Sequence, residues 1–391
     1  LESFKRRLKS QADQFRRACL GAANQIFSPT NFSPFQLKSF ADWLASLRLA
    51  SRSPYRKDAP RERDYFNLRK MIVVSTLKSI VYGIDSSDGT IIWHLYLGRN
   101  IKPLRSSLGD EKIPLYVQRT TAHYHFSPVA TVVAADESTG HTVLISFDPI
   151  TGTVSERKVL SVQVKRIELL PYTNPHTHKH HLVMLDNNNQ VILYPEYDGA
   201  MEQHAPVYLF NFNTAGDLEG FALNVALRKL LPVWKVKLGF SAEQKVVAVA
   251  AKPFHQKVHS AGRVLGNRSV LYKYVNPNLV AVASHDPIHS LLQIHLVDAV
   301  SGYIVYNAKQ NKIAGPVHLV HCENWLAYSY WNEKGRRMEI AVVELYEGLE
   351  QTDALHYNSL TPTLMPNVAA VSQAYIFPQG ITALGVTETG W

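Results

Sequence analysis

The feature that most constrains the fold is a five-residue frame that occurs three times. In each copy an apolar run ends at an Asp, a Gly follows four residues later, and a second apolar run begins. The pairs are Asp85 with Gly89, Asp148 with Gly152, and Asp298 with Gly302. Asp accepts hydrogen bonds from the amides that follow it, and Gly tolerates the positive φ at which a strand reverses. We therefore expect a tight β-hairpin at each copy.

Apolar runs of strand length continue along the chain, at residues 71–74, 182–185, 191–194, 279–283, 292–297 and 338–343. Residues 186–190 predict a hairpin turn with a degenerate copy of the frame, and residues 213–216 predict a weaker one. No long amphipathic helix pattern separates these runs, which disfavours a parallel βαβ architecture. Repeated hairpins of this kind predict an all-β fold, a β-propeller over residues 69–391, incomplete at its C-terminus.

The basic charge is concentrated before this β region. The whole chain has 41 Lys and Arg against 32 Asp and Glu, a net charge of +9. Residues 1–70 hold 15 of the basic and 6 of the acidic residues, which is also +9, so residues 71–391 are neutral. A neutral β domain argues against a nucleic-acid groove on the fold. A basic arm fits an anionic membrane surface or an acidic partner.

Residues 1–50 predict an amphipathic helical segment. Ser33 and Pro34 are suited to the N-cap and first turn of its second helix. The expected apolar stripe and its flanking cation are Leu37, Phe40, Trp43, Leu44, Leu47 and Arg48. Such a stripe fits a helix docked on its own β domain and an interfacial helix equally well. Residues 51–68 are rich in charge and proline and predict a linker.

No run of residues reaches the ~18 apolar positions that a membrane span needs. We expect the targeting and membrane segments to lie outside these 391 residues. The two cysteines, Cys19 and Cys322, supply neither a disulfide framework nor a zinc cluster, and they leave the redox compartment open.

The sequence offers only weak candidates for metal-binding or catalytic residues. His176, His178, His180 and His181 lack acidic or Cys partners at ligand spacing, which favours a solvated inter-blade loop over a metal site. No nucleophile, zinc-protease, phosphate-loop or dinucleotide motif occurs. We therefore predict no catalytic residues, metal or cofactor. Asn267 and Asn31 stand in Asn-x-Ser sequons and are candidate glycosylation sites, although Pro34 follows the second.

The repeated hairpin, with Trp93 closing its first copy, resembles the blade signature of quinoprotein (PQQ-type) propellers. The resemblance supports the propeller class. It also raises an alternative function, a quinone- or metal-dependent oxidoreductase, which would need a metal site and a catalytic Asp at the propeller axis.

Several longer strings are similar to one family, and they run over roughly residues 66–391. They include residues 117–123, 259–266, 268–273, 276–279, 315–318, 323–325, 330–332, 344–348 and 373–378. The family is subunit 1 of the endoplasmic-reticulum (ER) membrane protein complex.

The resemblance implies a lumenal propeller on a scaffold subunit with a single C-terminal transmembrane helix, expected outside these residues. It further implies a complex that inserts tail-anchored and multipass membrane proteins without ATP. The implied partners are the other subunits, with membrane-protein clients reached indirectly and a membrane surface contacted by residues 1–50.

Overall fold

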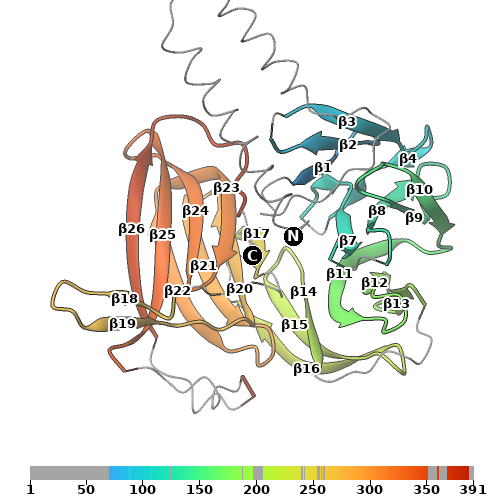
Figure 1. The fold of residues 1–391 in the computed structure, drawn as a ribbon. Coiled ribbons are helices and arrows are strands. Elements are labelled where there is room, and N and C mark those ends of the chain that lie inside the picture. The colour runs from blue at the N-terminus through green and yellow to red at the C-terminus, as the bar shows by residue number, and fades with distance from the viewer. Residues whose placement is uncertain are drawn as a thin grey trace, which may run out of the picture.

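The computed structural model describes residues 70–386 apart from gaps at 88, 107, 123–124, 187, 197–205, 239–240, 242, 253–255, 257, 259, 351–358 and 361–367. All regular secondary structure in these residues is β-strand, and every pairing is antiparallel. The strands form six sheets of three to six strands and one two-stranded sheet (Figure 1). The predicted all-β fold is confirmed. The part of the chain that the structure describes contains no helix long and apolar enough to cross a membrane.

We number the six larger sheets I to VI in chain order. Sheet I contains β1 (Met71–Ser75), β2 (Ile80–Asp85) and β3 (Ile91–Tyr96). Sheet II contains β4 (Ile101–Lys102), β7 (Leu115–Arg119), β8 (Val129–Asp136), β9 (Thr142–Phe147) and β10 (Val154–Val159). Sheet III contains β11 (Val164–Thr173), β12 (His180–Asp186) and β13 (Val191–Tyr194).

Sheet IV contains β14 (Val207–Phe212), β15 (Asp217–Asn224) and β16 (Lys229–Lys237). Sheet V contains β17 (Lys245–Ala251), β20 (Leu279–Asp286), β21 (Leu291–Asp298) and β22 (Ile304–Asn311). Sheet VI contains β18 (Gly262–Val264), β19 (Val270–Lys273), β23 (Ile313–Cys322), β24 (Trp325–Asn332), β25 (Arg337–Gly348) and β26 (Ala369–Phe377). The small sheet pairs β5 (Leu104–Arg105) with β6 (Glu111–Lys112).

The sheets follow one another around a common middle. Figure 1 shows sheets I to III on one side, sheet IV below, and sheets V and VI on the other side. The first strand of a sheet, such as β11, β14 or β17, lies nearest the middle, and later strands lie farther out. This is the arrangement of propeller blades, in which the faces of neighbouring sheets are buried against each other.

Five separate hydrophobic cores join the sheets in sequence. One core lies between each of the pairs I–II, II–III, III–IV, IV–V and V–VI. The middle strands contribute to two cores at once, because alternate side chains of a strand point to opposite faces. On β20, for example, Val280 and Val282 pack toward sheet IV, whereas Ala281 packs toward sheet VI. Burial on both faces explains why these strands are continuously apolar.

Among the described residues, no comparable core joins sheet VI to sheet I. The predicted helical segment 1–50 and the linker 51–68 lie outside the described residues. The domain boundary at residue 69 therefore stays a prediction, as does the incompleteness at the C-terminus.

Candidate functional site

The three predicted Asp–Gly turns have the same geometry. In each, the Gly amide donates to the Asp carbonyl, at 2.9 Å for Gly89, 2.8 Å for Gly152 and 2.8 Å for Gly302. The Asp carboxylate accepts from the amide two residues later, at 2.7 to 2.9 Å. The glycine φ values lie between +74° and +76°. The hairpins expected from the sequence are thus formed by the expected interactions.

The structure adds turns of the same frame that the sequence analysis missed. Asp136 and Gly140 repeat it in full between β8 and β9, with the amide of Gly140 2.9 Å from the carbonyl oxygen of Asp136 and a φ of +70°. The four-residue spacing of Asp136 and Gly140 is visible in the sequence and could have predicted this turn. Asn174 begins another copy in which His178, at φ +53°, replaces the Gly. A non-Gly residue at that position gives no signal in the sequence.

The two degenerate copies form shorter turns. In residues 186–190 the positive φ falls on Asn189, three residues after Asp186, and in residues 213–216 it falls on Gly216, three residues after Asn213. Both turns close with a backbone hydrogen bond of 3.2 Å from that residue to the first residue of the turn.

A tryptophan on the third strand of sheet I contacts the predicted turn of sheet II. Trp93 lies against Gly83 of its own sheet, where an added Cβ would be 2.2 Å from the indole ring. The same ring lies against Gly152, where an added Cβ would be 2.7 Å away. Phe147 meets it edge to face at 5.7 Å. Only Gly leaves room for the ring at both positions, so Trp93 fastens sheet I to sheet II.

A second tryptophan makes the equivalent contact between sheets IV and V. Trp234 lies against Gly220 of its own sheet and against Gly302 of the next, where added Cβ atoms would be 2.0 Å and 2.7 Å from the ring. Its indole N–H also donates to the carbonyl oxygen of Ala299 at 2.9 Å. Two of the three predicted Asp–Gly turns therefore receive a tryptophan from the preceding sheet. The spacing of the turns alone did not reveal this role.

The third predicted turn, at Asp298, is also held in place by hydrogen bonds to its carboxylate. Asp298 is fully buried, and its Oδ2 accepts from Asn276 Nδ2 at 2.9 Å and from Ser359 Oγ at 2.7 Å. Both bonds connect this turn to distant parts of the chain. A buried carboxylate engaged in this way is a structural group.

The histidine cluster is distributed along one hairpin. His176 and His178 lie in the turn between β11 and β12, and His180 and His181 lie on β12. This turn is within sheet III, so the expectation of a loop between blades was wrong. His180 Nδ1 lies 2.9 Å from the carbonyl oxygen of Leu170, and His181 Nδ1 lies 2.9 Å from that of Pro195. The described residues contain no group of three or more metal-ligating side chains.

Two further histidines, outside this hairpin, have strongly lowered pKa values. The strongly shifted histidines are buried groups within the fold. Burial lowers the pKa of His295 to about 4 and that of His321 to about 3, so both imidazoles are neutral near pH 7. The oxidoreductase alternative stays a prediction.

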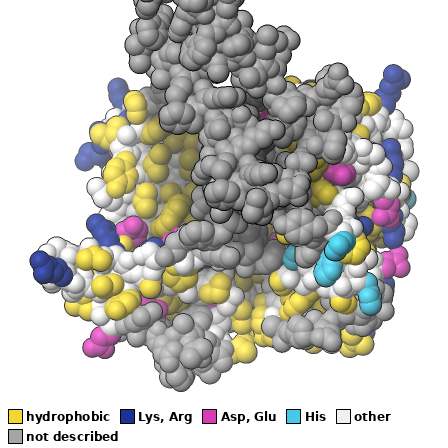
Figure 2. Space-filling view, in the orientation of Figure 1, with side chains coloured by type: hydrophobic (Ala, Val, Ile, Leu, Met, Phe, Trp, Pro, Cys, Tyr) yellow, Lys and Arg dark blue, Asp and Glu magenta, His cyan; other side chains and the backbone are white. Residues whose placement is uncertain are grey.

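A strand with exposed apolar side chains lies at the edge of sheet VI. Strand β26 pairs with β25 from Met338 opposite Phe377 to Tyr346 opposite Ala369, and all nine of its residues are exposed. Val371, Tyr375 and Phe377 alternate along the strand and so share one face, with 49%, 51% and 37% of their surfaces exposed. Apolar side chains also gather on this side of the space-filling view (Figure 2). A long exposed edge strand is a template for association.

A β-hairpin projects beside this surface (Figure 1). Its strands β18 and β19 meet at a turn that contains the exposed Asn267, whose Oδ1 accepts from the amide of Ser269 at 3.0 Å. Arg263 at its base lies 3.5 Å from the carboxylate of Glu344. The other sequon, at Asn31, lies outside the described residues, as do Leu37, Phe40, Trp43, Leu44, Leu47 and Arg48.

Successive antiparallel sheets, joined by one core per interface and by tryptophans seated on Asp–Gly turns, define a β-propeller protein. The family model described as "ER membrane protein complex subunit 1, second beta-propeller" matches residues 67–391. The chain belongs to this family, ER membrane protein complex subunit 1.

Similar curated proteins have the same name. The chain is 40% identical to ER membrane protein complex subunit 1 of Gallus gallus over 84% of its length, covering 33% of the relative. It is 37% identical to that of Xenopus laevis over the same shares of both chains. It thus spans about a third of the length of these relatives. The shared name describes those relatives as a subunit of an ER membrane protein complex.

Similarity to solved structures is low. The structure of BBS1N in complex with ARL6DN has a TM-score of 0.35 at 11% identity, covering 73% of this chain and 77% of that one. The WD40 domain of SCAP from fission yeast has a TM-score of 0.31 at 8% identity, covering 78% and 60%. These scores add no weight to the family assignment.

Proposed function

We propose that this chain is part of a non-catalytic lumenal scaffold subunit, which supports ATP-independent insertion of tail-anchored and multipass membrane proteins by the ER membrane protein complex. The observation that carries the proposal is the exposed edge strand β26 on a propeller whose family consists of complex subunits. The scaffold acts by holding other subunits, so clients are reached indirectly.

Strand β26 suits a subunit contact for two reasons. Its outer edge pairs with no other strand among the described residues, so its backbone groups are available to a partner. Its apolar face would lose contact with water in an assembly, which stabilises association. Val371 and Tyr375 lie on that face and make no contribution to the five inter-sheet cores.

The test is affinity purification of the tagged full-length protein from ER membranes, with Val371→Lys and Tyr375→Lys introduced together. Two charges on the apolar face would oppose burial against a partner. A matched control carries Val159→Lys and Tyr303→Lys, which replace the same residue types at exposures of 56% and 49% on β10 and in the turn before β22. Exposed substitutions of either kind change stability by about 0.5 kcal/mol or less.

We expect the β26 variant to recover sister subunits poorly and the control to recover them fully. Equal recovery by the two variants would show that β26 is not the contact. If the unmodified protein recovered no sister subunit, the scaffold role itself would be wrong.

The lumenal location is a separate part of the proposal. The exposed Asn267 at the tip of the β18–β19 turn is accessible to a glycosyltransferase, which acts only on the lumenal side. We expect endoglycosidase treatment to shift the protein and the Asn267→Gln variant to lack that shift. Protease protection in sealed microsomes checks the side of the membrane independently, and digestion of the propeller there would contradict a lumenal location.

Contact of residues 1–50 with the membrane surface also belongs to the proposal. Its support is the sequence pattern alone, with Trp43 and Arg48 beside an apolar stripe. The combined variant Trp43→Ala with Arg48→Ala should float less with anionic liposomes than the unmodified protein. Equal flotation would rule out this contact.

A further inference from the structure

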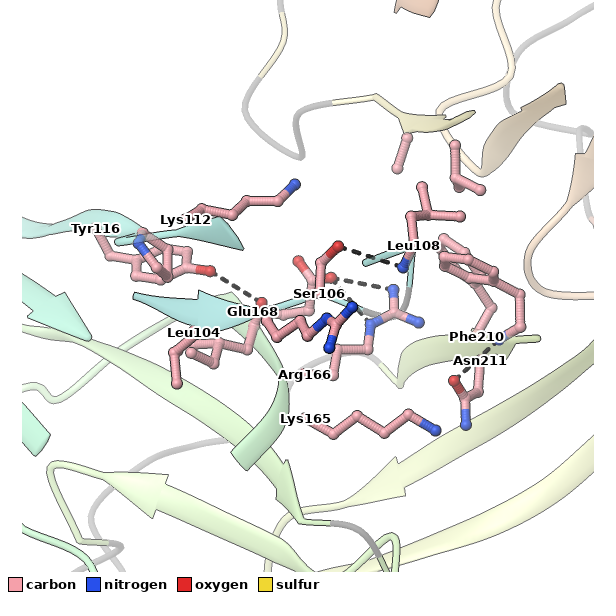
Figure 3. A pocket seen from close by; sticks show the side chains of 16 residues that line it. Leu104, Ser106, Leu108, Lys112, Tyr116, Lys165, Arg166, Glu168, Phe210 and Asn211 are labelled. Carbon is pink, nitrogen blue, oxygen red and sulfur yellow. Dashed lines mark hydrogen bonds and ion pairs between the residues drawn. The ribbon is translucent and has the colours of Figure 1, made fainter. Parts of the chain in front are cut away.

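A cavity of about 300 Å³ lies between the β5–β6 hairpin and the first strands of sheets III, IV and V (Figure 3). This volume is at the lower end of the range found for small-molecule sites. Leu108 at the tip of the hairpin packs against the core between sheets IV and V, so that core holds the hairpin in place. The cavity is therefore built from several parts of the fold.

The cavity has an excess of positive charge. Four cationic side chains line it, Arg105, Lys112, Lys165 and Arg166, and Glu168 is the one carboxylate in its lining. Arg166 donates to Glu168 Oε1 from Nε at 3.1 Å and from Nη2 at 3.0 Å, so that carboxylate is already engaged. Neither Lys112 nor Lys165 forms an ion pair with a described residue. The cavity lining therefore carries more positive than negative charge.

Arg166 is also held in a fixed position. Its guanidinium lies 4.1 Å from the centre of the Phe210 ring, a favourable cation–π arrangement. The remaining nitrogen, Nη1, is buried and has no hydrogen-bond partner among the described residues. Because Nη1 has almost no accessible surface, other atoms of Arg166 form the part of the lining that a ligand could meet.

The rest of the lining is apolar. Leu104 and Phe210 contribute to the wall, together with Leu108 and Val249. Leu104 and Lys112 are cross-strand partners, so the apolar and the cationic side chain occupy the same face of the hairpin. Figure 3 shows Lys112 and Lys165 on opposite sides of Arg166. Cationic groups thus stand beside an apolar surface.

We propose that this cavity binds a small organic anion with an apolar group, either a carboxylate or a phosphate monoester. The cationic side chains match the oxygens of such an anion, and the leucines and Phe210 match its apolar part. The inference is independent of the proposed scaffold role, because it concerns a site inside the propeller and not a contact with another subunit.

Calorimetric titration of the purified full-length protein tests the site with four probes: hexyl phosphate, hexanoate, hexanol and inorganic phosphate. We expect saturable binding of hexyl phosphate, of hexanoate or of both, and binding at least about tenfold weaker for hexanol and inorganic phosphate. Affinity should fall when salt is raised to about 0.15 M, because salt screens exposed charges. Whichever of hexyl phosphate and hexanoate binds more tightly shows whether the site takes a phosphate monoester or a carboxylate.

The variant test replaces the two exposed lysines together, Lys112→Gln with Lys165→Gln, and leaves the partly buried Arg166 in place. We expect affinity to fall about tenfold or more, whereas the control Lys229→Gln, an exposed lysine elsewhere, should bind normally. Circular dichroism confirms that each variant is folded. Absence of binding by both organic anions, equal binding by the double variant, or equal binding of hexanol would each overturn the proposal.

Discussion

The two tryptophan contacts are alike in shape and different in polarity. Trp93 and Trp234 each lie against a Gly of their own sheet and a turn Gly of the next, and the distances agree within 0.2 Å. The N–H of Trp234 reaches the carbonyl of Ala299, whereas the buried N–H of Trp93 finds no acceptor among the described residues. Packing of the ring on glycine is thus the shared element, and the hydrogen bond is an addition at one site.

The largest expected effect comes from removing the rings. Trp93→Ala and Trp234→Ala should each lower the free energy of unfolding by about 3–5 kcal/mol, because each leaves a cavity between two sheets. Denaturant titration of the two variants measures this loss. A loss below about 1 kcal/mol at one site would show that its sheets are joined mainly by their aliphatic core.

The next largest effect is expected from acid, which should destabilise sheet V before sheet II. Burial first, and then Lys309, lowers the pKa of His295 in sheet V to about 4. The unfolded chain, with an ordinary His pKa of about 6.5, binds the proton first, so stability present above about pH 6.5 is lost as pH falls toward 4. The loss is on the order of 3 kcal/mol.

Hydrogen exchange from pH 7 to 4 measures this difference. Amides of sheet V, which receives Trp234, should lose protection before those of sheet II, which receives Trp93. His295→Gln should reduce the difference, since Gln does not titrate. A parallel loss in both sheets, unchanged by the variant, would contradict the assignment to His295.

Alanine at the turn glycines tests the close approach of the ring. Gly89 and Gly152 have nearly equal φ values, +74° and +76°, but an added Cβ at Gly89 meets nothing within 4 Å. Gly89→Ala therefore measures the backbone cost alone, about 1 kcal/mol. Gly152→Ala and Gly302→Ala should cost about 1–3 kcal/mol more, because the methyl group overlaps the indole. Equal costs at Gly89 and Gly152 would mean that the ring moves aside freely.

These contacts also show which features the sequence could predict. The Asp–Gly turns were predictable because their hydrogen bonds and positive φ involve only five consecutive residues. The contact of Trp234 with Gly302 was not, because it depends on which sheets are neighbours in space. The turn at Asn174 was missed because His178 replaces the Gly. The exposed side chains of β26 resemble those of any strand, since the sequence does not indicate which edge stays open.

The cavity was unpredictable for a related reason. Lys112, Lys165 and Phe210 are far apart in the chain, and only the order of the sheets brings them together. Charge counting could not find them either, because residues 71–391 are neutral as a whole. A local excess of cations is hidden when the opposite charges lie elsewhere on the surface.

The smallest expected effect comes from removing only the indole N–H, which forms a hydrogen bond to a described residue at Trp234 and not at Trp93. Trp234→Phe removes the donor to Ala299 and leaves that carbonyl oxygen without it, at a cost of about 1 kcal/mol beyond the lost packing. Trp93→Phe removes a buried N–H that had no acceptor, so the packing loss is partly offset. We therefore expect Trp234→Phe to destabilise the protein by about 1 kcal/mol more than Trp93→Phe in denaturant titration. Equal losses would mean that the indole N–H of Trp93 is satisfied in solution and that the two contacts are energetically the same.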